Sequence, residues 1–224
     1  MNIPDLAPFW LTLKLAALVT ALLLVLGTPL AWWLARSRSR IAPAVEALTA
    51  LPLVLPPTVL GFYLLLAFNP QSPFGAFWLD LTGATLTFSF TGLVLASILY
   101  SLPFTVQPLQ SAFTALGTAP VETAASLGAS PMDAFVSVAL PLSARGYLTA
   151  AVLTFAHTLG EFGVVLMVGG NIPGETRVIS IAIYEHVERL DYGAAHWLSG
   201  MLLVLSFTIL LALYGLTGRD RRRR

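Results

Sequence analysis

The feature that most constrains this chain is a succession of long apolar segments separated by shorter polar connections. Of its 224 residues, 57% are hydrophobic and only 10% are charged, and the mean hydropathy is +0.81. A soluble core of this size does not need so little charge, so the composition is typical of a membrane protein. We expect an all-α polytopic fold in one domain over residues 1–224. Its five transmembrane helices are expected at about residues 10–34, 45–68, 84–109, 147–168 and 194–216. A polar loop with turn signals at Asn69-Pro70 and Ser72-Pro73 is expected over residues 69–83, and a short helix is expected near residues 180–189.

The distribution of arginines predicts the orientation of these helices. Arg36, Arg38 and Arg40 follow the first apolar segment, Arg145 precedes the fourth, and an arginine-rich tail occupies residues 219–224. The connections on the other side carry most of the acidic residues, namely Asp5, Asp80, Glu175, Glu185, Glu188 and Asp191. Because basic residues concentrate on the cytoplasmic side, we expect the N-terminus outside and the C-terminus in the cytoplasm. The first apolar segment lacks a basic leader region, so we expect it to be a span.

One segment in the middle of the chain, residues 117–146, does not resemble a membrane span. It favours two short helices, the first beginning at Thr118 as N-cap and ending at Gly128 in a left-handed conformation. The second begins with Ser130 as N-cap and Pro131 at the first helical position. Such a pair is often only a packed helical hairpin. On the cytoplasmic side of a membrane protein, it also suits a surface on which another protein docks.

Two groups of residues inside the expected spans are candidates for a functional role. The string LPLVLPPTVLG in the second span holds several prolines, which produce either a packing kink or a broken helix lining a pathway. His157 and Glu161 in the fourth span are four residues apart and therefore share a helix face. They either hold helices together or lie on a polar pathway. The pathway or gate candidates are Pro56, Pro57, His157, Glu161, Asn171, Thr176 and Arg177.

Several kinds of chemistry have no signature in the sequence. Cysteine is absent, and there is no GxSxG motif, no HExxH motif and no cluster of histidine and aspartate at metal-ligand spacing. No phosphate loop of the GxxxxGK[ST] type is present, so ATP hydrolysis by that route is not expected of this chain. We therefore expect neither an enzyme nor a metal site. A channel remains an alternative, although a channel does not need a capped cytoplasmic helix pair.

The 117–146 segment resembles a known signature. Glu122 and Ala124, with Gly128 four residues after the alanine and Leu140-Pro141 further on, are similar to the EAA motif of bacterial ABC importer permeases. Thr123 departs from the literal wording of that motif. The resemblance implies a type I ABC importer permease fold, in which two coupling helices dock on a cytoplasmic ATPase. The residues that it implies for this coupling are Glu122, Ala124, Ala125, Gly128, Ala129, Leu140 and Pro141.

Two further strings narrow the resemblance to a subfamily. LPLVLPPTVLG (51–61) and GEFGVVLMVGGNIPGETR (160–177) are similar to molybdate importer permeases, and the likeness covers essentially the whole chain. Sulfate and thiosulfate permeases share both regions, but they are typically longer, and the NIPGETR wording is closer to the molybdate group. The resemblance therefore implies transport of molybdate, with tungstate as a shared substrate, and sulfate or thiosulfate as the alternative.

The resemblance also implies partners and a location. It implies a permease homodimer, two cytoplasmic ABC ATPase subunits that carry ATP and magnesium, and a periplasmic oxyanion-binding protein. The location it implies is the bacterial inner membrane, in contact with lipid. No cofactor on this chain and no nucleic acid are expected.

Overall fold

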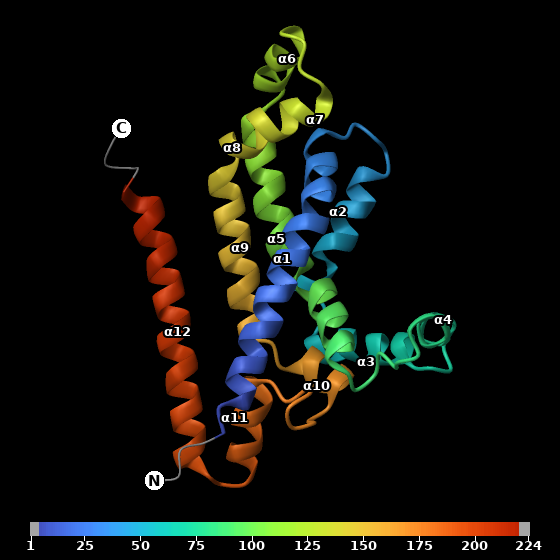
Figure 1. Cartoon of the computed structure of the whole chain (residues 1–224), viewed down its shortest axis with the longest axis vertical. Helices are drawn as coiled ribbons and strands as arrows, with labels where there is room; N and C mark the ends of the chain where they lie inside the picture. The colour runs from blue at the N-terminus through green and yellow to red at the C-terminus, as the bar shows by residue number, and fades with distance from the viewer. Residues whose placement is uncertain (1–4, 220–224) are drawn as a thin grey trace.

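The computed structural model describes residues 5–219, and within that range the chain forms helices and no strand (Figure 1). Three helices, α1 (Ala7–Arg36), α5 (Phe90–Leu116) and α9 (Ala144–Leu159), pack against one another along the long axis of the molecule. A further helix, α12 (Tyr192–Arg219), lies at one side of this bundle and contacts α9. The expected all-α architecture is therefore confirmed for the described residues.

By length and composition, three to five segments of the described residues can cross a membrane. Among residues 5–219, three helices are long and apolar enough to cross a membrane, and two bent pairs of helices pass the same test when each is taken together. The three are Ala7–Arg36, Phe90–Leu116 and Tyr192–Ala212, and the pairs are Ala42–Leu53 with Pro57–Phe68 and Pro131–Leu142 with Ala144–Leu159. The described residues thus provide up to five crossings, the number expected.

The core lies along α1, where buried side chains recur every four residues. Leu15, Val19 and Leu23 form one stripe and pack with Leu93 and Val94 of α5. This spacing places them on a single helix face, so α1 turns one side toward the bundle.

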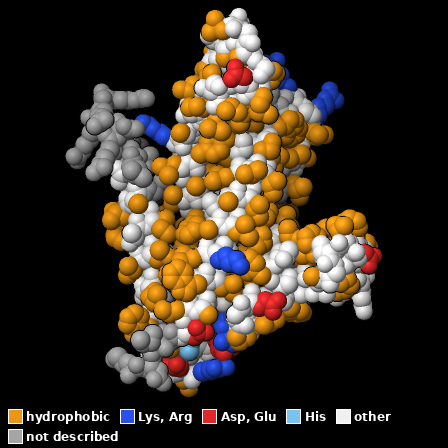
Figure 2. Space-filling view, in the orientation of Figure 1, with side chains coloured by type: hydrophobic (Ala, Val, Ile, Leu, Met, Phe, Trp, Pro, Cys, Tyr) orange, Lys and Arg blue, Asp and Glu red, His pale blue; other side chains and the backbone are white. Residues whose placement is uncertain are grey.

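The outer surface of the bundle is also apolar. Val25 is 71% exposed, Leu203 69% and Phe207 64%. Figure 2 shows hydrophobic side chains over the middle of one face, with charged side chains gathered mainly toward the two ends. An apolar belt between two charged ends suits a protein surrounded by hydrocarbon, where leaving such side chains exposed costs little.

The second expected span is a broken helix. It consists of α2 (Ala42–Ala50), a 3-10 turn at Leu51–Leu53 and α3 (Pro57–Phe68), and the two halves are bent by 110°. Pro57 disfavours helical geometry at the residue before it, and Pro56 accordingly has an extended ψ of 136°. Of the two interpretations of the prolines, the broken helix therefore describes the structure.

The fourth expected span also differs from the prediction. A continuous helix over residues 147–168 is wrong, because α9 ends at Leu159 and a separate short helix, α10 (Gly163–Gly169), follows. The break carries the backbone carbonyl of Glu161, which accepts a hydrogen bond from the Ser180 hydroxyl. A tertiary contact thus satisfies part of the interrupted backbone, which an apolar sequence pattern does not reveal.

The third span is shifted along the chain relative to the expected bounds of 84–109. The α5 helix begins at Phe90, after Ser89 accepts a 3.1 Å hydrogen bond from the amide of Gly92, and it continues to Leu116. Phe88 has a positive φ of 57°, and its amide donates to the carbonyl of Val168 at 2.9 Å. This contact keeps the residues before α5 out of the helix.

A helix occupies part of the connection that was expected to be a polar loop. Residues 69–83 contain α4 (Pro73–Thr82), which begins after Ser72 as N-cap and ends at Gly83 with a φ of 72°. The turn signals there mark the ends of a helix, and the expectation of a loop was wrong for the residues between them.

The 117–146 segment forms the short helices expected of it. They are α6 (Ala119–Ser126), α7 (Pro131–Ala134), a π-helical turn η2 (Phe135–Ala139) and α8 (Leu140–Leu142). Ser130 caps α7 by accepting a 3.2 Å hydrogen bond from the amide of Asp133, and Gly128 has the expected positive φ, at 92°. The predicted side-chain cap at Thr118 was wrong, because its hydroxyl makes no capping hydrogen bond.

The two ends of the molecule carry different elements. Figure 1 places α6 and α7 at one end, together with the turn that joins α1 to α2, and places α11 (Ile179–Glu188) at the other. The helix α11 matches the short helix expected near residues 180–189. Arg36, Arg38 and Arg40 therefore lie at the same end as the 117–146 segment. The tail residues 220–224, which also entered the prediction of orientation, lie outside the described residues.

Candidate functional site

The two helix breaks meet at a cleft of about 580 Å³. A Cβ atom added at Gly163 would lie 2.9 Å from Cβ of Pro57, so the two breaks approach as closely as a glycine allows. The residues that line the cleft are Pro57 and Thr58 of α3, Tyr100 of α5, Ala156 and His157 of α9, and Gly160, Glu161, Phe162 and Gly163 at the second break. Three of the sequence candidates, Pro57, His157 and Glu161, are thus brought together, with Pro56 adjacent in the chain.

Glu161 is an acidic side chain with incomplete hydrogen bonding. It is only 3% exposed, and its Oε2 accepts a hydrogen bond from the hydroxyl of Ser97 on α5. Its Oε1 is buried and has no hydrogen-bond partner among the described residues. Buried polar atoms are nearly always paired, so an unpaired oxygen in the wall of a cleft marks a place for a further group.

A seam of hydroxyl groups joins α5 to α9 beside the cleft. Ser101 of α5 lies 3.0 Å from Oγ1 of Thr158, and Thr105 lies 2.5 Å from Oγ1 of Thr154. All of these side chains are buried. Hydrogen bonds between small polar residues are a common means of joining helices inside a membrane.

His157 lies between this seam and the cleft. Its Nδ1 is 2.9 Å from Oγ of Ser101. Its ring stacks on Phe104 at a centroid distance of 3.9 Å and lies 4.7 Å from the ring of Tyr100. His157 therefore joins α9 to α5 through one edge of its ring and also lines the cleft, and its role on a polar pathway stays a prediction.

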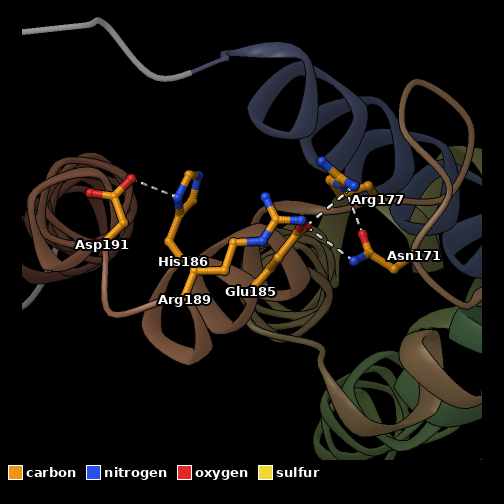
Figure 3. A network of polar contacts seen from close by, with 6 residues as sticks. All are labelled: Asn171, Arg177, Glu185, His186, Arg189 and Asp191. Atoms are coloured by element: carbon orange, nitrogen blue, oxygen red, sulfur yellow. Dashed lines mark hydrogen bonds and ion pairs between the residues drawn. The ribbon is translucent and has the colours of Figure 1, made fainter.

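Two of the remaining pathway candidates, Asn171 and Arg177, lie elsewhere, in a polar network near α11 (Figure 3). Nε of Arg177 donates to Oδ1 of Asn171 at 2.6 Å, and Nη2 of Arg177 lies 3.3 Å from Oε2 of Glu185. Asn171 also donates to Oε2 of Glu185 at 3.0 Å, and Arg189 contacts Oε1 at 2.5 Å. The network fastens the 170–177 loop to α11.

The charges of this network perturb Glu185. The hydrogen bond from Asn171, together with the charges of Arg177, Arg189 and His186, lowers the pKa of Glu185 below its ordinary value. His186 in turn pairs with Asp191 at 3.2 Å. Glu185 is thus held ionised at neutral pH by its surroundings.

Thr176 is a structural residue of the same loop. Its hydroxyl donates to the carbonyl of Gly169 at 2.7 Å and accepts from the amide of Ile172 at 3.1 Å, and the side chain is fully buried. It closes the loop after α10 and does not line the cleft.

The coupling candidates lie at the opposite end of the molecule from this network. Glu122, Ala125 and Gly128 are exposed, and Ala124 and Ala129 are partly buried. Leu140 and Pro141 are exposed on α8. Leu127, between the two short helices, is 85% exposed, so this end presents an apolar tip that the chain itself does not cover.

Sequence reasoning missed several polar residues of the site. Ser97, Ser101 and Thr105 recur every four residues on α5, and their hydroxyls contact Glu161, Thr158 and Thr154, respectively. This spacing was a usable signal, because hydroxyls at helical period within an apolar span indicate one polar face. Tyr100 and Glu185 carried no comparable signal.

The comparison with known proteins identifies the family. Residues 27–223 match the family model described as the binding-protein-dependent transport system inner membrane component. The chain belongs to this family. The expectation of an importer permease is thereby confirmed, and the chain is a multi-pass membrane component of a transport system rather than an enzyme.

Curated members of the family are similar over most of their length. The molybdenum transport system permease protein ModB of Azotobacter vinelandii is 58% identical over 94% of this chain and 93% of the relative. The protein of that name from Mycobacterium tuberculosis is 40% identical over 95% of this chain and 80% of the relative. The sulfate transport system permease protein CysT of Escherichia coli is 33% identical over 89% of this chain and 72% of the relative.

A solved structure supports the fold. A chain in the inward-facing structure of the MetNI methionine ABC transporter superposes with a TM-score of 0.67, covering 93% of this chain and 92% of that one. At 20% identity this likeness concerns the fold alone, and it confirms the expected ABC importer permease fold. Members of the family act with a binding protein and a separate ATPase, so this permease has both kinds of partner.

Proposed function

We propose that the chain is the permease subunit of an ABC importer that moves molybdate, with tungstate as a shared substrate, across the bacterial cytoplasmic membrane. The observation that carries this proposal is its 58% identity with the Azotobacter vinelandii molybdenum permease over 94% of the chain. The sulfate permease from Escherichia coli is 33% identical. A sulfate or thiosulfate substrate is therefore the second candidate.

The proposed assembly contains two copies of this chain and two ATPase subunits that carry ATP and Mg²⁺. The exposed residues of the 117–146 segment dock on the ATPase, and closure of the ATPase subunits moves the two segments together. The N-terminus is outside and the C-terminus is in the cytoplasm. Supporting this orientation, Arg36, Arg38 and Arg40 lie at the same end as the docking segment.

In this assembly the permease provides two states of one pathway and no covalent chemistry. The cleft at the two helix breaks is the part of the pathway that this chain contributes. Broken helices suit that role, because freed backbone groups are tolerated at membrane depth only where protein or a polar cavity satisfies them. A site that binds the anion weakly is sufficient, since tight binding would slow release.

The periplasmic binding protein docks at the end that carries α11. The acidic residues there, Glu175, Glu188 and Asp191, are exposed. They repel a free dianion but suit a partner that shields the anion and presents basic residues.

Competition between anions tests the substrate. Cells that lack their own molybdate permease are given this chain with its ATPase and binding protein, and uptake of radiolabelled molybdate is measured. Unlabelled molybdate and tungstate should suppress the uptake, whereas sulfate in equal excess should not. Suppression by sulfate as strong as that by molybdate would establish the sulfate alternative.

A further inference from the structure

His157 is joined to a chain of hydroxyl groups between α5 and α9. The hydroxyl of Thr158 donates to the backbone carbonyl of Thr154 at 3.0 Å, because a carbonyl can only accept. Oγ of Ser101 lies 3.0 Å from Oγ1 of Thr158, and either hydroxyl can be the donor in that contact.

The chain of hydroxyl groups ends at the histidine ring. Oγ of Ser101 lies 2.9 Å from Nδ1 of His157 and can donate to it or accept from it, depending on the tautomer of the ring. Where Ser101 donates, Nδ1 is the acceptor and the neutral ring carries its proton on Nε2.

The other ring nitrogen of His157, Nε2, is available to a group in the cleft. No described residue forms a hydrogen bond with Nε2 of His157, and His157 lines the cleft at the helix breaks. The ring is held by Ser101 on one edge and by the stacked ring of Phe104 on its face. Nε2 is thus positioned by contacts that do not occupy it.

We propose that Nε2 of His157 is the group that hydrogen-bonds the transported tetrahedral oxyanion as it passes the cleft. This proposal rests on the proposed function, and it adds the residue and atom that contact the cargo. An oxyanion only accepts hydrogen bonds, so Nε2 contacts it while carrying a proton. The neutral ring supplies this donor when Nδ1 accepts the proton of Ser101.

The neighbouring groups make such a contact weak. From the second break, Glu161 lines the same cleft and has an unpaired Oε1, and from α5 the hydroxyl-bearing ring of Tyr100 lies beside His157. The cleft residues of α3, Pro57 and Thr58, do not titrate. Among the described residues, neither lysine nor arginine lines the cleft. A dianion is then held by a directed hydrogen bond without a cationic side chain and is released easily, as transport requires.

Substitution of His157 by asparagine tests the proposal in the complete importer. Asparagine retains a hydrogen-bonding group near the position of Nδ1 and has no atom at the position of Nε2. The His157→Asn permease should assemble with its ATPase and yet lose about tenfold or more of radiolabelled molybdate uptake, as expected for a lost hydrogen bond to a charged group. The matched control is His196→Asn on α12, where the histidine lines a separate apolar cleft with Phe9 and Trp197. This control should transport like the unmodified chain.

Substitutions at Ser101 provide a second test that leaves the histidine in place. Ser101→Ala removes the hydroxyl that holds Nδ1, so uptake should fall several-fold, and Ser101→Thr, which restores a hydroxyl, should recover it. Normal uptake by His157→Asn, or equal uptake by Ser101→Ala and Ser101→Thr, would overturn the proposal. If the unmodified importer moves no molybdate, the proposed function fails instead, so the two failures are distinguishable.

Discussion

At the scale of single residues, Glu161 joins two parts of the structure. Its carboxylate accepts from Ser97 on α5, and its backbone carbonyl accepts from Ser180 on α11. The residue therefore ties the second helix break both to the central bundle and to the end where α11 lies. The unpaired Oε1 indicates that this arrangement is not designed for stability alone, because an unpaired buried oxygen is costly.

Replacement of Glu161 by glutamine tests whether this residue serves helix packing or transport. Glutamine keeps the shape and an oxygen that can accept from Ser97, while it replaces a carboxyl group whose Oε1 has no hydrogen-bond partner among the described residues. The melting temperature of the purified permease should therefore be unchanged or higher, whereas molybdate uptake should fall about tenfold, because the carboxyl group lines the cleft. A lower melting temperature with uptake preserved would show that Glu161 only holds helices together.

Single residues also show how far the sequence could lead. His157 and Glu161 were predicted to share a helix face, and both line the cleft with Pro57. Asn171 and Arg177 were grouped with them only because they follow in the same string, and the structure places them in the network with Glu185. The sequence shows which residues are polar, but only the folded structure shows which of them lie close together.

At the scale of elements, the 117–146 segment carries the proposed link to the ATPase. Gly128 has a φ of 92°, and a Cβ atom there would meet nothing within 4 Å in this chain. Its surroundings within the permease therefore do not exclude a side chain, although the backbone conformation is unfavourable for one. A bulky side chain at this position should therefore interfere mainly with the protein that docks on the segment.

Leucine at Gly128 should abolish ATP-driven uptake while the permease still inserts into the membrane. The matched control is Gly174→Leu, because Gly174 also has a positive φ, 76°, and also has open space around it, but lies in the loop near α11. Copurification with the ATPase should be lost for the first variant and retained for the second. Full ATPase association and normal uptake of Gly128→Leu would contradict the docking role.

The loop and helix joined by Glu185 should respond to acid. The lowered pKa of Glu185 means that its ionised form stabilises the folded chain. This stabilisation is complete above the ordinary pKa of 4.5 and is lost as pH falls through the lowered value. The melting temperature of Glu185→Gln should therefore lie below that of the unmodified chain at pH 7, and the difference should shrink below pH 4.5. Glu175→Gln, which alters an exposed carboxylate nearby, should show no such difference.

The ends of helices were predictable where one local sequence signal dominated. Ser130 as N-cap and Gly128 as helix end followed from local chemistry, and both are confirmed. The break before Gly163 was not predictable from periodicity, because residues 160–168 are largely apolar and contain no proline. That break depends on contacts with Pro57 and Ser180, which are distant in sequence.

At the scale of the whole molecule, the orientation across the membrane can be measured directly. The sequence contains no cysteine, so a single introduced cysteine is the only thiol. Leu127, at the tip between α6 and α7, is 85% exposed, and Leu190, after α11, is 71% exposed. In spheroplasts, an impermeant thiol reagent should label Leu190→Cys and should label Leu127→Cys only after the membrane is opened. The reverse pattern would contradict the proposed orientation.

The architecture of the whole molecule followed from the sequence more completely than its site did. Long apolar segments and short polar connections predict a helical membrane protein, because the hydrocarbon phase permits few other structures. The 110° bend in the second span and the early end of α9 arise from packing between spans. The cleft exists only because these two irregularities coincide, which a single sequence does not show.

The most direct test of the account is ATP-driven transport by purified components. The permease and its ATPase are reconstituted into vesicles with the binding protein and radiolabelled molybdate on the outer side and ATP on the ATPase side. The account predicts that molybdate accumulates inside only when permease, ATPase, binding protein and ATP are all present. Accumulation without ATP or without the ATPase would indicate a channel, and no accumulation of molybdate by the complete system would contradict the account.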